Sequence, residues 1–124
     1  MTDASPPILQ LATKLKKDHH AIYLGRQDGH PIFGSSEDHL LVIGPPRSGK
    51  TSRILTPTVA CHPGPVIAVS TRPDLLADSV AARRTIASYY GGTVQQLSLA
   101  GSHIEPGLAT VRWNLTDGCD QWET

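Results

Sequence analysis

The sequence contains few cysteines, few aromatic residues and no excess of charge of either sign. Cys61 and Cys119 are the only cysteines in 124 residues. They are too few and too far apart for a disulfide framework or a zinc cluster, so both are expected to be the reduced thiols of a cytosolic protein. Aromatic residues make up 5% of the chain, and eleven basic residues balance eleven acidic ones. A polyanion would therefore have to be attracted by a local basic patch or by an assembly of copies.

The sequence also lacks long hydrophobic runs and clustered metal ligands. No stretch approaches the roughly 20 apolar residues of a membrane span. Residues 1–7 lack the basic start and the apolar core of a signal peptide. His62 beside Cys61 and the pair His19-His20 have no further ligands nearby, which argues against a metal cluster. These absences predict a cytoplasmic chain without a transmembrane segment, forming one domain or part of one.

The most informative stretch is a glycine-rich loop that follows an apolar run. Residues 40–43, Leu-Leu-Val-Ile, are too few for a helix and predict a buried strand. A Gly, four variable positions and Gly-Lys-Thr come next, which is the pattern of a phosphate-binding loop that opens a helix. The predicted nucleotide-binding residues are Gly44, Pro45, Pro46, Arg47, Ser48, Gly49, Lys50, Thr51 and Ser52.

The residue types in this loop suit the binding of a triphosphate. Gly44 and Gly49 allow backbone conformations that direct successive N–H groups into one concavity. The following helix adds the positive end of its dipole, and Lys50 adds a charge that can reach the β- and γ-phosphates. Thr51 would place its hydroxyl on the Mg²⁺ that bridges these phosphates. The loop therefore predicts ATP and Mg²⁺ as ligands, and leaves ATP and GTP undistinguished.

Two segments precede the loop. Residues 1–20 are predicted to be a flexible segment with a short basic helix over 8–17. Its lysines form either a solvated helix end or a contact with a phosphate backbone or an anionic membrane surface. Residues 21–33 predict two short strands joined by an Asp28-Gly29 turn, which would either pack against the sheet or frame the nucleotide base. Residues 21–124 are predicted to be an incomplete P-loop NTPase domain.

The segments after the loop alternate between helix and strand. The predicted elements are a helix from Lys50 interrupted at Pro57, a buried strand over 65–70, a helix from a capping box at Thr71 and Asp74 to about Tyr90, and strands over 93–99 and 109–113. Pro57 interrupts its helix because it cannot donate to the carbonyl four residues back. The order predicts an α/β fold, with a parallel sheet and flanking helices after a small β-hairpin.

One part of a hydrolytic site is missing from the sequence. An NTPase needs a carboxylate at the end of an apolar strand, to hold the water shell of Mg²⁺ and orient the attacking water. No run of four apolar residues is followed by Asp or Glu, since the second predicted strand ends in Ser70 and Asp117 follows Asn-Leu-Thr. Catalytic residues are therefore unassigned. Either another segment supplies the carboxylate, or the protein binds nucleotide and hydrolyses it poorly.

Taken together, these residues resemble the ATPases of conjugative DNA transfer, the type IV secretion coupling proteins of the TraG/TraD group and their actinobacterial relatives. The resemblance covers about residues 21–124, and it lies in the order and spacing of short markers. The markers are Val42 to Thr51, Pro57, Pro63-Gly64-Pro65, Ser70 to Leu75, Arg112-Trp113-Asn114 and Asp117-Gly118.

The resemblance implies a RecA-like motor at the cytoplasmic face of the bacterial membrane. Such motors form ring hexamers and couple ATP hydrolysis to the movement of single-stranded DNA or protein into a secretion channel. Lys50 and Thr51 correspond to the phosphate and Mg²⁺ residues. The family's Asp-x-Lys-Gly-Glu-Leu is replaced by Ser70 to Leu75, which keeps Arg72 and Asp74 but loses the first acid. The family's membrane helices and later acidic strand are absent, so membrane contact is expected only through partners.

Three functions follow from this sequence. The chain is expected to resemble the first third of a motor domain, as a truncated copy, a split subunit with a partner, or a decayed copy. It would then be either an ATPase module active within a larger assembly or a nucleotide-binding fragment without turnover. An unrelated small phosphotransferase fits less well, because the sequence has neither an arginine-rich lid nor an acidic cluster for an acceptor.

Overall fold

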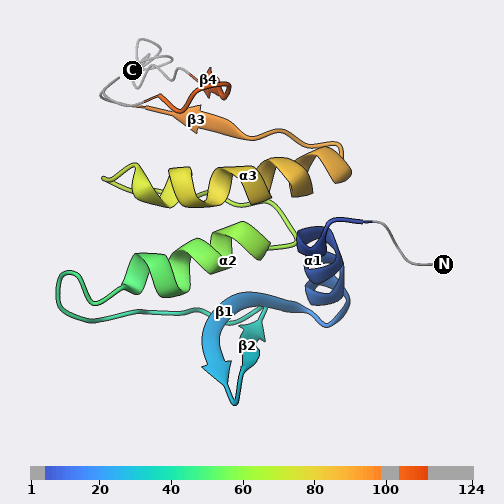
Figure 1. The fold of residues 1–124 in the computed structure, drawn as a ribbon, viewed down its shortest axis with the longest axis vertical. Helices are drawn as coiled ribbons and strands as arrows, with labels where there is room; N and C mark the ends of the chain where they lie inside the picture. The colour runs from blue at the N-terminus through green and yellow to red at the C-terminus, as the bar shows by residue number, and fades with distance from the viewer. Residues whose placement is uncertain (1–4, 99–103, 112–124) are drawn as a thin grey trace, which may run out of the picture. The chain divides into compact units, whose positions relative to one another are not determined.

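The computed structural model describes residues 5–98 and 104–111, which fall into two compact units. The first unit is Met1–Thr93 and the second is Val94–Thr124. Figure 1 shows the helices and strands of each unit in the order of the chain. Every helix in the described ranges is too short or too polar to cross a bilayer.

Two helices hold the core of the first unit. α1 spans Pro7–Lys17 and α3 spans Asp74–Tyr89. Leu9 and Ala12 of α1 and Ile86 of α3 are buried together in one apolar cluster. Full burial of a large aliphatic side chain contributes about 1.5–3 kcal/mol. α1 therefore belongs to the core of the first unit. This unit includes residues on both sides of the boundary predicted at residue 20.

The two ends of α3 were predicted with different success. The helix is followed by Gly91 at φ 71°, a left-handed conformation that favours glycine, so the predicted stop is confirmed. The predicted capping box is wrong. Pro73 already has helical dihedral angles and no side chain caps the helix. Asp74 instead lies in the first turn, where its carboxylate accepts a hydrogen bond from the N–H of Leu75, so Thr71 lies outside the helix.

The predicted hairpin is present. β1 (His20–Gln27) and β2 (His30–Ser35) pair antiparallel. The turn residues Asp28 and Gly29 have φ angles of 51° and 81°. These positive values are those of a type I′ turn, which matches the twist of the two strands. The Asp-Gly prediction is therefore confirmed.

The helix after the glycine-rich loop changes its hydrogen-bond pattern close to the predicted interruption. A π-helical turn, η1 (Thr51–Leu55), leads directly into α2 (Thr56–Cys61). The N–H of Thr56 donates to the carbonyl of Thr51, five residues back. Pro57 has no N–H, so an α-helical hydrogen bond from Pro57 to the carbonyl four residues back cannot form. The wider π turn ends just before this position. α2 itself continues through Pro57 to Cys61, so the helix changes its hydrogen-bond pattern before Pro57 and does not stop there as predicted.

Two contacts between distant residues hold α2 in place. The hydroxyl of Thr58 donates to the carbonyl of Ile54 at 2.7 Å and accepts from the N–H of Tyr23 in β1 at 3.1 Å. Arg83 of α3 donates to the carbonyl of His62 and, at 3.0 Å, to that of Gly64. The guanidinium therefore satisfies two carbonyls of the segment that follows α2 and ties that segment to α3.

Cys61, the last residue of α2, gives a testable pH dependence. Its thiol is buried and free, and burial raises its pKa above the ordinary value of 9.0, with its backbone hydrogen bond and the charge of Arg83 acting in the opposite direction. The folded state therefore holds the proton more tightly than the unfolded state. We expect the stability from the protonated thiol to be complete below about pH 8 and to decrease as the pH rises through the range in which an exposed thiol ionises.

Urea denaturation at a series of pH values would measure this effect. The free energy of unfolding should fall more steeply between about pH 8 and 10 in the wild type than in Cys61→Ala, because the variant lacks this buried thiol. Equal slopes in the two proteins would contradict the prediction.

The second unit contains a short parallel sheet. β3 (Gln95–Leu97) pairs with β4 (Ala109–Val111). The side-chain carbonyl of Gln96 in β3 accepts a hydrogen bond from the N–H of Glu105 at 2.8 Å. Both strands lie within the predicted ranges. The end of the predicted range 109–113 lies outside the described residues.

The two buried strands predicted beside the glycine-rich loop are absent from the structure. Residues 40–43 and 65–70 have no regular secondary structure. Their exposed apolar side chains include Leu41 (81%), Ile43 (85%), Ile67 (95%) and Val69 (92%). A strand forms only where a neighbour takes its backbone hydrogen bonds, and the only sheets among the described residues are the pairs β1-β2 and β3-β4. The prediction of buried strands is therefore wrong here, and the P-loop NTPase sheet stays a prediction.

Candidate phosphate-binding site

The backbone of the predicted phosphate loop turns sharply between the open segment 40–43 and η1. The N–H of Ser48 donates to the carbonyl of Pro45 at 3.3 Å, which closes a turn. Arg47 and Gly49 have φ angles of 63° and 84°. Where residues in the left-handed backbone conformation alternate with residues in other conformations, neighbouring N–H groups point toward the same side. This local arrangement can bind an anion. The loop thus has backbone features expected of a phosphate cradle.

Lys50 folds back over this turn. Its ammonium group donates to the carbonyls of Gly44 and Pro45, both at 2.7 Å, and lies 3.4 Å from the hydroxyl oxygen of Ser48. All three contacts are exposed to solvent. These bonds hold the ammonium group at the loop. Because water can replace them at small cost, the group remains available to an anion.

The two glycines are required for different reasons. A Cβ on Gly44 would lie 3.1 Å from the hydroxyl oxygen of Ser48, so a side chain there would press on the loop. Gly49 has a positive φ, and a Cβ there would also lie 3.1 Å from the side chain of Arg53. Gly44 therefore serves close packing, and Gly49 serves the left-handed turn.

The start of the helix leaves donors available. No side chain caps η1, and its first turn contains no acidic residue. The N–H groups of Arg47, Gly49 and Lys50 have no acceptor in the described part of the chain. The hydroxyl of Ser52 donates to the carbonyl of Gly49 at 3.4 Å, whereas that of Thr51 has no partner among the same residues. These groups can bind phosphate oxygens and, in the case of Thr51, an Mg²⁺ ion.

The charges around the loop are cationic. Arg47, Lys50 and Arg53 lie within or directly after it, and no carboxylate pairs with them in residues 5–98 and 104–111. The same residues contain no group of three or more His, Cys, Asp or Glu that could hold a metal ion. The donor set therefore fits a phosphate group well. It fits Mg²⁺ only through Thr51, with the remaining ligands coming from the nucleotide and from water.

No protein-family model, curated protein or solved structure matches the chain.

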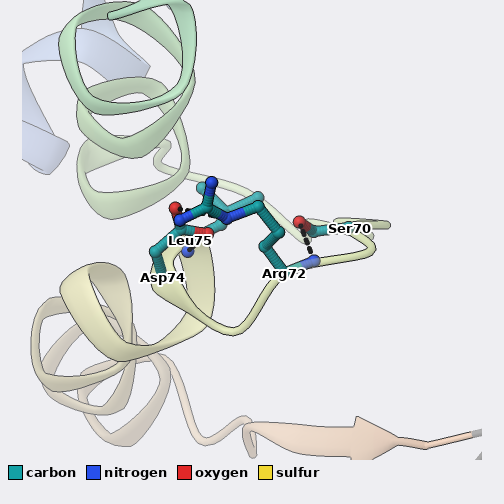
Figure 2. Close-up of polar contacts among 4 residues, drawn as sticks. All are labelled: Ser70, Arg72, Asp74 and Leu75. Carbon is teal, nitrogen blue, oxygen red and sulfur yellow. Dashed lines mark hydrogen bonds and ion pairs between the residues drawn. The ribbon is translucent and has the colours of Figure 1, made fainter. Parts of the chain in front are cut away.

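The marker of the resemblance from Ser70 to Leu75 forms a local turn around an ion pair. Figure 2 shows the guanidinium of Arg72 beside the carboxylate of Asp74, with 3.4 Å between Arg72 Nε and Asp74 Oδ2. The hydroxyl of Ser70 accepts a hydrogen bond from the N–H of Arg72 at 3.1 Å. The side chain of Arg72 is largely exposed and that of Asp74 is partly exposed, so water screens the pair and it contributes about 1 kcal/mol at most. The cation and the acid that the sequence retains here pair with each other.

Sequence patterns missed the two contacts that support the helix after the loop. The bond between Thr58 and Tyr23 joins residues 35 apart, and Arg83 reaches Gly64 across 19 residues. Local periodicity carries no signal for such distant pairs, and an arginine within a helix usually faces solvent. The markers at Trp113, Asn114 and Asp117 lie outside the described residues.

Proposed function

We propose that the chain binds Mg²⁺-ATP through residues 44–52, as a phosphate-loop module of the kind found in conjugative DNA-transfer ATPases. The observation that carries the proposal is the position of Lys50, whose ammonium group is held by exposed carbonyls of the loop. The N–H groups of Arg47, Gly49 and Lys50, which have no acceptor in the described part of the chain, accompany it. A phosphate anion complements both kinds of donor.

The residues would share the binding as follows. The N–H groups of the loop would donate to phosphate oxygens, and Lys50 would exchange its bonds to the carbonyls of Gly44 and Pro45 for bonds to a phosphate. Thr51 would supply a hydroxyl ligand to Mg²⁺. When bound, the metal ion would neutralise charge on the phosphates. The sheet, the ring assembly and the transport of DNA or protein are parts of the proposal that rest on the resemblance alone.

A second candidate, nucleotide binding without turnover, is favoured by the charges at the site. No carboxylate accompanies Arg47, Lys50 and Arg53 in the described part of the chain. Hydrolysis requires a group that positions the attacking water and supports the metal ion. We therefore expect the isolated chain to bind ATP and to release phosphate very slowly, whereas a larger assembly could supply the missing group.

Calorimetry and a phosphate-release assay test both candidates. The chain is titrated with ATP in the presence of Mg²⁺, and phosphate release is then followed with and without single-stranded DNA. Binding with no release under either condition supports the module without turnover. Release that DNA stimulates supports a DNA-coupled ATPase. A chain that shows no heat with ATP, and none with GTP, contradicts the proposal in both forms.

A further inference from the structure

A cavity of about 570 Å³, open to solvent, lies between α1 and the last residue of α3, and no residue of the phosphate loop lines it. Figure 1 shows α1 beside the end of α3, where Leu9 and Ile86 are buried together. The volume falls within the range of small-molecule sites, roughly 300–1,000 Å³. Its polar lining comes from positions three and four apart on α1, which are neighbours on one helix face. These residues are Gln10, Thr13, Lys14 and Lys17, and Tyr89 of α3 adds to the wall.

The charge of the lining is positive. Lys14 and Lys17 both line the cavity, and no carboxylate lines it or pairs with either lysine in residues 5–98 and 104–111. Lys16 does not line it, because its Nζ lies over the ring of Tyr90, 5.0 Å from the centre. Two unpaired ammonium groups one helical turn apart can bind the same anion, whereas Lys16 already contacts an aromatic ring.

The dipole of α1 does not cancel this charge. The carboxyl end of a helix carries about half a negative charge, which disfavours an anion. In α1 the N–H of Asp18 donates to the carbonyl of Lys14 at 2.9 Å, so part of that charge is already satisfied. The full charges of Lys14 and Lys17 exceed what remains. The cavity therefore favours an anion, and a dianion more than a monoanion.

The rest of the lining suits an organic group. Leu9 is apolar and 7% exposed, and Tyr89 is 60% exposed. The ring of Tyr89 packs edge-on against that of Tyr90, with 5.1 Å between the ring centres. A planar group can pack on a tyrosine ring of this kind. The hydroxyl of Thr13 has no partner among the described residues and can donate to an anion.

We infer that this cavity is a second ligand site, which binds a small phosphate monoester. A monoester carries roughly 1.5 to 2 negative charges at pH 7, which matches the ammonium groups of Lys14 and Lys17. The organic group would contact Leu9 and Tyr89. Mg²⁺-ATP fits less well, because the metal ion neutralises charge on its phosphates. The chemistry is the same for a soluble monoester and for the headgroup of phosphatidic acid, and it does not depend on the phosphate loop.

An NMR titration of the ¹⁵N-labelled full chain with phenyl phosphate tests the soluble form. The amide signals of α1 and of Tyr89 should shift. Lys14→Gln and Lys17→Gln should each weaken binding about tenfold, because each removes one charge from the cavity. Tyr89→Ala should weaken binding about threefold, and Tyr89→Phe should restore it. These side chains are exposed, so the fold should persist in the variants.

Two matched controls separate a site from a positive surface. Lys16→Gln removes the same charge from the same helix turn, and its affinity for phenyl phosphate should stay within about twofold of the wild type. Phenyl sulfate has the same ring and one negative charge, and it should bind about tenfold more weakly. Equal losses in Lys16→Gln and Lys17→Gln overturn the inference, as do equal affinities for phenyl phosphate and phenyl sulfate.

Vesicle sedimentation tests the lipid source. Phosphatidylcholine vesicles with phosphatidic acid are compared with vesicles in which phosphatidylglycerol, a phosphate diester, supplies the same surface charge. Preference for phosphatidic acid that Lys17→Gln abolishes, without shifts by phenyl phosphate, assigns the site to a lipid headgroup. Shifts by phenyl phosphate without that preference assign it to a soluble monoester. The absence of both overturns the inference.

Failure of this inference is separable from failure of the proposed function. Phenyl phosphate shifts confined to residues 44–52 would place the phosphate at the loop and overturn the second site. A chain that binds ATP at the loop without any response of α1 to phenyl phosphate or to phosphatidic acid loses only the second site. A chain that binds phenyl phosphate at α1 but ignores ATP keeps the second site and loses the nucleotide site.

Discussion

Replacement of Lys50 by alanine is expected to lower the affinity for Mg²⁺-ATP about a hundredfold. In the free protein the ammonium group makes only exposed hydrogen bonds, to the carbonyls of Gly44 and Pro45. Water can satisfy these carbonyls in the variant, so folding should change little. In the complex, a charge-assisted bond to phosphate contributes roughly 1.5–3 kcal/mol, and a loss of about 2.8 kcal/mol corresponds to the expected hundredfold change in Kd. Isothermal titration calorimetry measures the change in Kd.

Lys14→Ala is the matched control for this experiment. Lys14 lies in the last turn of α1, and it is not part of the loop. Its removal takes away the same charge at another surface, so the affinity for ATP should stay within about twofold if the effect of Lys50 is local. An equal loss in both variants would indicate a general electrostatic attraction. An unchanged Kd in Lys50→Ala would contradict the assignment of the loop as the phosphate site.

The parts of the fold that the sequence predicted are fixed by neighbouring residues. The hairpin turn depends on Asp28 and Gly29, whose positive φ angles few other residue types adopt readily. The end of α3 depends on Gly91 in the same way. The change from the π-helical turn to α2 lies next to Pro57, where a single N–H is missing. The left-handed turn of the loop at Gly49 belongs to this class, which is why its pattern was recognisable from a few positions.

The parts that the sequence mispredicted depend on distant residues. The apolar runs at 40–43 and 65–70 have the composition of buried strands, but composition cannot supply the neighbouring strand that would bury them. The bonds from Arg83 to Gly64 and from Tyr23 to Thr58 likewise join segments that no local pattern relates. At the candidate site, the sequence predicted the residue types of the cradle. It did not predict that Lys50 would rest on the carbonyls of its own loop.

Replacement of Ile86 by alanine should be the most destabilising single change in the core. Ile86 is 1% exposed and packs with Leu9 and Ala12, so it joins α3 to α1. Truncation of a fully buried isoleucine costs about 2–5 kcal/mol, because the transfer energy is lost and a cavity is left. That is a large fraction of the roughly 5–15 kcal/mol by which a domain is stable. Urea denaturation followed by circular dichroism measures the loss, and Ile86→Val should lose about 1 kcal/mol.

Leu41→Ala is the control at an exposed position. Leu41 carries a larger apolar side chain than the alanine that replaces it, but it is 81% exposed. Its truncation should therefore change the free energy of unfolding by about 0.5 kcal/mol or less. A cost similar to that of Ile86→Ala would show that Leu41 is buried in the isolated chain. The buried strand that the sequence predicts over residues 40–43 would then be present after all.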